Sequence, residues 1–233
     1  MLRDIIYRLS EWYRVNRRII YFFLIILFLS RFLYLNYINW TKGELCSGHG
    51  GIQYGMDSMR FLHGADKIIN HQDFADCEEN YMGYAFVIAF VKISGLDLSF
   101  VLIIQLIFAL LSSLALYDLG KSITKSKTIG LLSAGLYLIN PFITQWHLYI
   151  HTESFYSSML VISTWSIYKA VKNNNLKFYV LSLIIIFYTA LIRPNGMVTV
   201  PIFFFFVIIT RKINSRIKII SVISVIITFL FLI

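Results

Sequence analysis

Long apolar blocks separated by short polar stretches dominate the pattern of the chain. Three of these blocks read "IIYFFLIILFLSRFLYL" (residues 19–35), "LSFVLIIQLIFALLSSLALYDL" (98–119) and "FYSSMLVISTWSIY" (155–168). Each block approaches the ~20 apolar residues that a helix needs to cross a bilayer. The pattern therefore predicts an integral membrane protein of the all-α class.

Turn signals divide the chain into about six to seven predicted spans. We expect helices over residues 19–36, 98–119, 129–146, 154–170, 177–192 and 197–210, with a last one starting near residue 217. Asn140-Pro141 marks the end of the third of these helices, because the residue before proline is pushed out of the helical region. We interpret residues 1–233 as a single transmembrane domain whose bundle occupies residues 98–233.

A large polar loop with juxtamembrane helices is predicted between the first two spans, over residues 37–97. Within it, residues 84–94 form an apolar core that is too short to span, so residues 83–98 are interpreted as a re-entrant or interfacial helix. Residues 1–18 read as a basic amphipathic segment on the cytoplasmic side. The chain ends inside an apolar segment, and we expect it to be part of a longer protein.

Composition agrees with this class of protein. Of the 233 residues, 58% are hydrophobic and only 14% are charged. Water-soluble domains average about 45–50% apolar and about 25% charged residues. No small-residue cleavage site follows residues 19–35, which read as an anchor helix and not as a cleavable signal.

The net charge of +9 is distributed unevenly along the chain. If the N-terminus is cytoplasmic, the cytoplasmic side holds 15 of the 21 Lys and Arg residues but only three of the 12 acids. The positive-inside rule predicts this asymmetry. The basic charge therefore orients the chain in the cytoplasmic (inner) membrane and gives no reason to expect a nucleic-acid partner.

Five candidate polar residues converge on the predicted outer face. Asp57 lies in the first outer loop, Glu153 opens a predicted span, and Arg193 ends another. His147 and His151 precede Glu153 at i, i+4 spacing. Ionisable groups at a membrane boundary are costly and tend to line cavities in pairs, so a functional site is plausible there.

Simpler interpretations of these residues stay open. Asp57 is a suitable N-cap for a helix over residues 58–70, with an apolar stripe of Met59, Leu62, Ala65 and Ile69. Glu153 is able to cap its own helix and pair with Arg193, which is itself interpretable as a helix stop with a snorkelling base. The two histidines either bind a metal with Glu153 or pack at the interface beside Trp146 and Tyr149.

Two cysteines, Cys46 and Cys77, both fall in the predicted outer loop. A disulfide there is chemically permitted and would brace the loop. A pair of unbonded thiols is the equal alternative.

Several ordered motifs resemble those of the GT-C membrane glycosyltransferases. "YGMDSMRFLHGADKII" is similar to a first-loop pattern with Asp57, Phe61 and Ala65 in register, and "NYMGYAFVIAFVKISGLDL" resembles the juxtamembrane helix that follows it. "LINPFITQWHLYIHTESFYSSML" and "TALIRPNGMVTVPIFFF" are similar to later elements of the family. The resemblance covers roughly residues 19–212 and is closest to the bacterial branch of protein O-mannosyltransferase-like and aminoarabinose transferase-like enzymes.

The sequence departs from the family pattern at two places. Ser58 follows the first aspartate where an acid is common, and the prolines usual near the start of the juxtamembrane helix are absent around Tyr81–Tyr84. Family members also continue through several further spans.

The resemblance implies transfer of a sugar from a polyprenyl-phosphate carrier to a glycan, lipid or protein acceptor at the outer face. Asp57 would be the base that takes the acceptor's proton. Arg193, with Arg60 or Lys67, would stabilise the negative charge of the phosphate. Glu153 would position the acceptor or hold Arg193. His147 and His151 are candidate phosphate donors or ligands for a divalent metal.

Two apolar regions are candidate binding surfaces for the polyprenyl tail within the membrane lipid. They are the segment 83–95 and the aromatic run Phe203, Phe204, Phe205 and Phe206.

Other classes of function make different demands on the sequence. A transporter would need polar residues inside several spans, and the middle spans offer little beyond Gln105 and a few serines. A non-catalytic scaffold or a flippase-like subunit of a cell-envelope glycan pathway remains the alternative function.

Overall fold

The computed structural model describes residues 2–47, 52–55, 57–74 and 79–209, together with residues 219 and 223. All regular elements within these residues are helical, and a single β-bridge joins Gln53 to Tyr149. The helix predicted from residue 217, the side chain of Cys46 and the whole of Cys77 lie outside the described part, and so does the predicted disulfide.

Nine α-helices and three short 3-10 helices make up the described residues. The α-helices are α1 (Leu2–Ser47), α2 (Ser58–Ile69), α3 (Met82–Ile93), α4 (Ser99–Thr124), α5 (Lys127–Ile139), α6 (Pro141–Thr144), α7 (Thr152–Asn173), α8 (Leu176–Ile192) and α9 (Thr199–Ile209). The 3-10 helices are η1 (Glu79–Tyr81), η2 (Gln145–Leu148) and η3 (Pro194–Val198).

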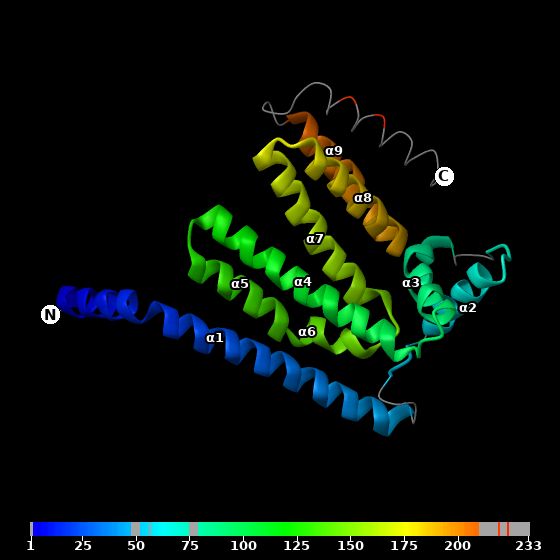
Figure 1. The fold of residues 1–233 in the computed structure, drawn as a ribbon, viewed down its shortest axis with the longest axis horizontal. Coiled ribbons are helices and arrows are strands. Elements are labelled where there is room, and N and C mark those ends of the chain that lie inside the picture. Colours follow the sequence, from blue (N-terminus) through cyan, green and yellow to red (C-terminus); the bar gives the residue numbers. More distant parts are fainter. Residues whose placement is uncertain are drawn as a thin grey trace.

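The long helices lie side by side as a bundle (Figure 1). The helix α1 runs along α5, α4 packs between α5 and α7, and α8 packs between α7 and α9. The short helices α2 and α3 pack on each other at one end of the bundle, where α3 also contacts α8. This end is where the candidate site lies.

Capping residues set the turns between the long helices. The Ser126 hydroxyl accepts a hydrogen bond from the Ile129 amide to start α5, and Asn175 caps α8 in the same way. Asn140 ends α5 in extended backbone, and its side chain then caps α6 from Pro141. The predicted boundary at Asn140-Pro141 is confirmed.

Within the described part of the chain, two helical stretches are long and apolar enough to cross a membrane, namely residues 15–42 of α1 and the whole of α4. Shorter apolar helices are α3, α5, α8 and the η3–α9 segment. The predicted span in α7 is not among these because serines interrupt it. These serines are buried and bond to helix carbonyls, as Ser163 does to Leu160 and Ser166 does to Ser163.

Glycines permit the closest helix contacts. A Cβ atom on Gly130 of α5 would lie 2.5 Å from the carbonyl oxygen of Tyr117 in α4. One on Gly83 of α3 would lie 2.8 Å from the backbone nitrogen of Ile192 at the end of α8. Small residues at such crossings are typical of membrane helices, because packing rather than water exclusion drives their association.

The predicted outer loop begins later than expected. The helix α1 continues through residues 37–47 instead of ending at residue 36. Polar side chains in this stretch are compatible with helix, and Thr41 bonds back to the carbonyl of Ile38. Beyond the boundary at Asn140-Pro141, the chain continues as the short helices α6 and η2. The change from apolar to polar residues marks the end of the apolar block, but the helix α1 continues beyond it.

The helix α2 begins at Ser58 as predicted, and three of the four residues of the predicted stripe, Leu62, Ala65 and Ile69, pack into or against the core. Its buried residues are Ser58, Phe61, Gly64 and Ala65. Met59, which the predicted stripe includes, is 57% exposed. Phe61 packs edge-on against Tyr84 of α3, with ring centroids 5.3 Å apart. Burial of such side chains contributes about 1.5–3 kcal/mol each and joins α2 to α3.

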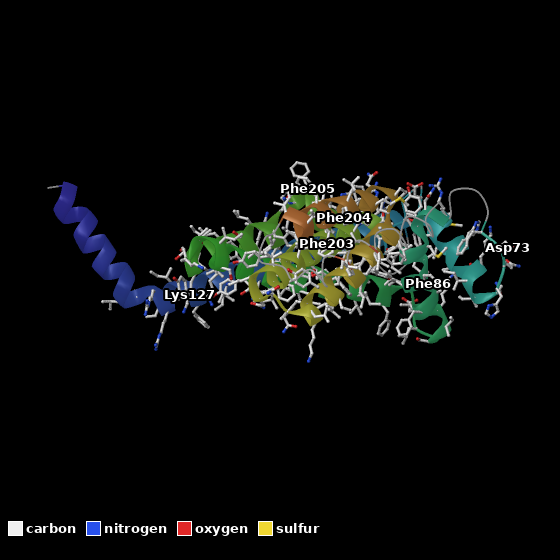
Figure 2. The ribbon with its side chains drawn as sticks, turned by 90° about the horizontal axis from the view of Figure 1, so that it is seen from above. Asp73, Phe86, Lys127, Phe203, Phe204 and Phe205 are labelled. Atoms are coloured by element: carbon white, nitrogen blue, oxygen red, sulfur yellow. The ribbon has the colours of Figure 1, made fainter. Side chains whose placement is uncertain are left out.

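The aromatic run in α9 divides between two faces. Phe203 is buried against α8, whereas Phe205 is 66% exposed and points outward in Figure 2. The side chain of Phe206 lies outside the described part. The run therefore presents Phe205 to the surroundings of the bundle and uses Phe203 for packing.

Candidate active site

The segment of residues 147–151, which is the end of η2 followed by extended backbone, joins two parts of the chain that are far apart in sequence. The Gln53 amide donates to the carbonyl of Leu148 at 2.9 Å, and the Ile150 amide donates to the carbonyl of Gln53 at 3.0 Å. The Ser58 hydroxyl donates to the carbonyl of Ile150 at 2.7 Å. These bonds hold the start of α2, and with it Asp57, against the segment that leads into α7.

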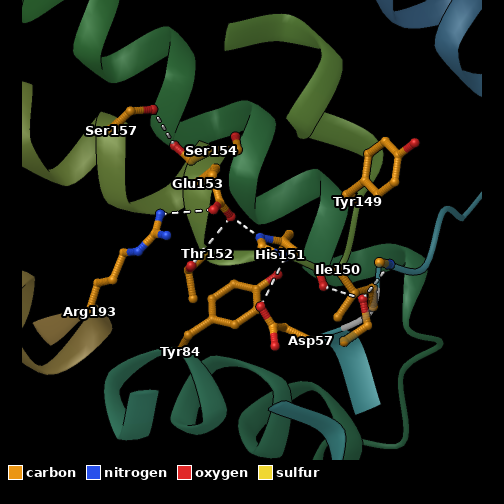
Figure 3. A network of polar contacts seen from close by, with 12 residues as sticks. Asp57, Tyr84, Tyr149, Ile150, His151, Thr152, Glu153, Ser154, Ser157 and Arg193 are labelled. Carbon is orange, nitrogen blue, oxygen red and sulfur yellow. Dashed lines mark hydrogen bonds and ion pairs between the residues drawn. The ribbon is translucent and has the colours of Figure 1, made fainter. Parts of the chain in front are cut away.

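Four side chains from three regions of the chain form a continuous polar network (Figure 3). The Oδ2 atom of Asp57 lies 3.9 Å from Nε2 of His151. The other ring nitrogen, Nδ1, lies against Oε2 of Glu153. The Nη1 atom of Arg193 donates to Oε1 of Glu153 at 2.8 Å. The structure thus brings together Asp57, His151, Glu153 and Arg193, all of which the sequence singled out.

Asp57 occupies the N-cap position of α2, but its carboxylate makes no capping hydrogen bond. The sequence-based expectation of a capping role is therefore wrong. Its backbone has helical dihedral angles, φ −84° and ψ −8°, whereas a capping residue is typically extended. The carboxylate instead lies between His151 and Arg60, whose Nη1 atom is 3.5 Å from Oδ1. With 45% of its side chain exposed, Asp57 is accessible to a ligand.

The His151 ring is held between two aromatic rings. Phe61 meets it edge-on with centroids 5.6 Å apart, and Trp146 lies tilted at 5.4 Å. Burial lowers the pKa of His151 below its usual value, Asp57 opposes this shift, and Arg193 adds to it. The imidazole is therefore neutral at pH 7. Because Nδ1 faces the Glu153 carboxylate, we assign the ring proton to Nδ1, which leaves the lone pair of Nε2 directed toward Asp57.

Glu153 and Arg193 are positioned by helix ends. Glu153 lies in the first turn of α7, where the helix dipole favours a negative charge. Arg193 follows α8 in extended backbone and precedes Pro194, so its side chain leaves the helix axis. Both side chains are mostly buried, with exposed fractions of 23% and 29%. The pairing that the sequence suggested for these two residues is present.

His147 is not part of the network, although it lies four residues before His151. Its ring is fully buried in η2, where Nδ1 bonds to the Ser154 hydroxyl at 2.6 Å and the ring packs edge-on against Phe32. Burial lowers the pKa of His147 to about 4, so the ring is neutral at pH 7. The i, i+4 pattern does not bring the two rings together because residues 149–151 are extended, not helical.

No metal-ligand set appears among the described residues: nowhere there do three His, Cys, Asp or Glu side chains lie together as ligands. The predicted set of His147, His151 and Glu153 is therefore not assembled. Lys67 is also placed away from Asp57, since it lies in the last turn of α2 and Asp57 precedes the first. Arg60 is beside Asp57.

Ser58 has a role that the sequence did not reveal. It is fully buried, donates to the Ile150 carbonyl and accepts from the Gly55 amide at 2.8 Å. An ionised acid at this position would have no proton to donate and would face a carbonyl oxygen. Gly55 is similarly constrained, because a Cβ atom there would lie 3.1 Å from Cδ2 of His151. Ser58 thus anchors the start of α2 next to Asp57.

A groove of about 660 Å³ opens beside the start of α2. Tyr54 and Met59, which flank Asp57 in the sequence, are among the residues that line it. Aromatic, aliphatic and polar side chains contribute to its walls: Trp40, Ile52, Tyr54, Met59, Leu62, Asp97, Leu98 and Ser99.

Comparison with known proteins identifies one family. The model of the dolichyl-phosphate-mannose-protein mannosyltransferase family matches residues 79–233, which include Glu153 and Arg193 but not Asp57. No curated protein and no solved structure matches the chain. The family consists of membrane glycosyltransferases that use polyprenyl-phosphate-linked sugar donors, which agrees with the apolar helices and with the predicted GT-C resemblance. The chain belongs to the dolichyl-phosphate-mannose-protein mannosyltransferase family.

Proposed function

We propose that the chain transfers a hexosyl group, with inversion, from a polyprenyl phosphate to an acceptor hydroxyl at the outer face of the cytoplasmic membrane. The single observation that carries this proposal is the network of Asp57, His151, Glu153 and Arg193 at one end of the bundle. It combines an exposed carboxylate, a neutral imidazole and a guanidinium, which are the groups that this transfer requires.

Asp57 acts as the base in this proposal. The acceptor oxygen forms a bond to the anomeric carbon as the bond from that carbon to the phosphate oxygen breaks, and the acceptor proton moves to Asp57. The neutral Nε2 of His151, 3.9 Å away, is able to receive this proton after a small movement. Glu153 then stabilises the imidazolium through Nδ1. The leaving polyprenyl phosphate is already acidic enough to depart without a proton donor.

Arg193 meets the negative charge that develops on the phosphate. Its bond to Glu153 uses Nη1, and a guanidinium carries five N–H donors in a planar fork that suits phosphate oxygens. Glu153 holds this fork in place and limits its motion. Arg60, 40% exposed beside Asp57, is the second cation within reach of the donor.

The membrane orientation follows from the charges at the two ends of the bundle. The α4–α5 turn carries Lys121, Lys125 and Lys127, at the opposite end of α4 from the site. With 26 residues, α4 is about 39 Å long, enough to separate the two membrane surfaces. The positive-inside rule then assigns the lysine-rich end to the cytoplasm and the site to the outer face, with a cytoplasmic N-terminus. We propose six to seven spans in this orientation.

The groove beside Asp57 is the proposed entry for the acceptor. Tyr54 and Met59 line this groove on either side of Asp57 in the sequence, and the Asp57 carboxylate is exposed to an acceptor hydroxyl that binds there. Aromatic walls and a carboxylate such as Asp97 are typical of sites that bind hydroxyl-rich ligands.

Reconstitution tests this function. The purified chain in liposomes is supplied with radiolabelled polyprenyl-phosphate mannose and an extract of envelope acceptors. We expect label to leave the lipid fraction and polyprenyl phosphate to accumulate in equal amount. Binding of the donor without any turnover would instead favour the non-catalytic scaffold.

A further inference from the structure

Gln105 of α4 is a buried polar side chain with no part in the proposed chemistry. It is fully buried, in the second turn of a helix that is otherwise largely apolar. Burying an amide costs free energy unless its donors and acceptor are satisfied. Its hydrogen bonds therefore indicate what the residue does.

All three of its described bonds converge near the site. Nε2 donates to the carbonyl oxygens of His147 at 3.2 Å and of Tyr149 at 3.0 Å. The Tyr84 hydroxyl donates to Oε1 at 3.4 Å. Both amide protons are thus used on residues 147–149, and the acceptor is used on α3.

The segment from residue 147 to residue 151 is therefore held along both edges. The segment contains the last two residues of η2 and the extended residues that follow it. The carbonyls of His147 and Tyr149 accept from Gln105, whereas those of Leu148 and Ile150 accept from Gln53 and Ser58. The side chain of Gln105 therefore holds two of these carbonyls, and the chain around Asp57 holds the other two.

We propose that Gln105 is a positioning residue that fixes the place of residues 147–151 and so holds His151 beside Asp57. A shift of this segment would move His151 away from Asp57 and Glu153, because the Tyr149 carbonyl that Gln105 binds is only two residues before His151. Gln105 acts through the segment and touches none of the reacting atoms. The link to sugar transfer rests on the proposed function, whereas the holding of the segment does not.

Hydrogen exchange tests the holding role without any substrate. Gln105→Met keeps the length of the side chain and removes both donors. We expect amide exchange in residues 147–153 to rise about tenfold or more, because local opening becomes easier. Gln105→Glu should fall between wild type and the methionine variant, since a buried carboxyl stays protonated and retains one donor.

Ser112→Ala is the matched control. Ser112 is equally buried in α4 and donates to the Ser158 carbonyl of α7 at 2.9 Å, away from the segment. This variant should leave exchange in residues 147–153 unchanged. Wild-type exchange in the Gln105→Met protein, or an equal rise in the Ser112→Ala protein, would overturn the holding role.

Kinetics then separate positioning from general stability. Gln105→Met should lower kcat about 10- to 100-fold while the donor KM changes less than about twofold, since small misplacements cost that much. Faster exchange with an unchanged kcat would overturn the positioning role. A wild-type protein without transfer activity would overturn the proposed function instead, and the exchange comparison would still decide the holding role.

Discussion

The carboxylate of Asp57 lies 3.9 Å from Nε2 of His151, although the helices α2, α3 and α4 separate the two residues in the sequence. A β-bridge and the Ser58 hydroxyl bring these segments together. The relationship couples an exposed acid to a partly buried, neutral imidazole, and the imidazole in turn to the pair of Glu153 and Arg193. The site therefore behaves as one network, and each member has its own expected effect.

Glu153→Gln should impair both activity and stability. The substitution leaves the Arg193 guanidinium without its carboxylate and removes the negative charge beside Nδ1 of His151. We expect a loss of about 1–2 kcal/mol in unfolding free energy, since the pair is largely buried, and a fall in kcat of about 100-fold. Chemical denaturation and initial-rate kinetics measure the two effects.

Asp66→Asn is the control for this variant. Asp66 also forms an ion pair, with Nζ of Lys92 at 2.6 Å, but its side chain is 50% exposed and away from the network. An exposed pair contributes at most about 1 kcal/mol, so stability and kcat should stay near wild type. Equal losses of stability and kcat in the two variants would contradict a specific role of Glu153 in the network.

Arg193→Lys should weaken donor binding even though it keeps the charge. A lysine ammonium cannot bridge Glu153 and a phosphate through a planar fork, so the donor KM should rise about tenfold, and more in Arg193→Gln. Lys92→Gln removes the cation of the Lys92–Asp66 ion pair and should leave the donor KM within about twofold of the wild-type value. If KM stayed at the wild-type value in Arg193→Gln, this arginine would not bind the phosphate.

Stability should fall as the medium is acidified, and His147 should account for part of the slope. The folded protein holds the pKa of His147 at about 4, whereas the unfolded chain has the ordinary value near 6.5. Between these two pH values the unfolded state takes up a proton and the folded state does not, which costs up to about 3 kcal/mol.

His147→Asn removes this contribution and preserves a partner for the Ser154 hydroxyl. The variant should be less stable than wild type at pH 7 but lose less of its stability between pH 6.5 and pH 4. Thermal unfolding in detergent at several pH values gives the slope of stability against pH for the wild type and for the variant. Parallel slopes would show that His147 is protonated in the folded protein.

Gly83→Ala should separate α3 from the end of α8. The added methyl carbon would lie 2.8 Å from the backbone nitrogen of Ile192, so the helices must move apart. The hydrogen bond from the Tyr188 hydroxyl to the Gly83 carbonyl, at 2.8 Å, would lengthen as well. We expect a loss of about 1–3 kcal/mol in unfolding free energy. Ser94→Ala, at the exposed end of the same helix, should cost little, and equal losses would contradict the packing account.

The helices could be predicted from the sequence because each depends on a local pattern. Apolar blocks indicated the cores of α4, α5, α8 and α9, and Asn140 before Pro141 marked the end of α5. The end of α1 could not be predicted, since polar residues such as Thr41 continue a helix beyond the apolar block. The serine-rich α7 was also harder to interpret, because burial among neighbouring helices depends on packing and not on its own hydropathy.

The members of the candidate site could be named from the sequence, but not the contacts among them. Asp57, Glu153 and Arg193 stood out as ionisable residues near predicted helix ends. The bridge between Gln53 and Tyr149 has no sequence signature, because backbone hydrogen bonds do not depend on side-chain identity. The i, i+4 spacing of His147 and His151 suggested that both rings lie on one face of a helix, but residues 149–151 are extended and separate the two rings.

The turnover of Asp57→Asn tests the proposed catalytic role most directly. Asparagine keeps the shape of the side chain but cannot take a proton, so labelled sugar transfer should fall by about 10²–10⁴-fold while donor binding and thermal stability stay near wild type. Asp73→Asn, an exposed residue after α2, should transfer sugar at the wild-type rate. Full turnover by Asp57→Asn, alongside an active wild type, would contradict the assignment of Asp57 as the catalytic base.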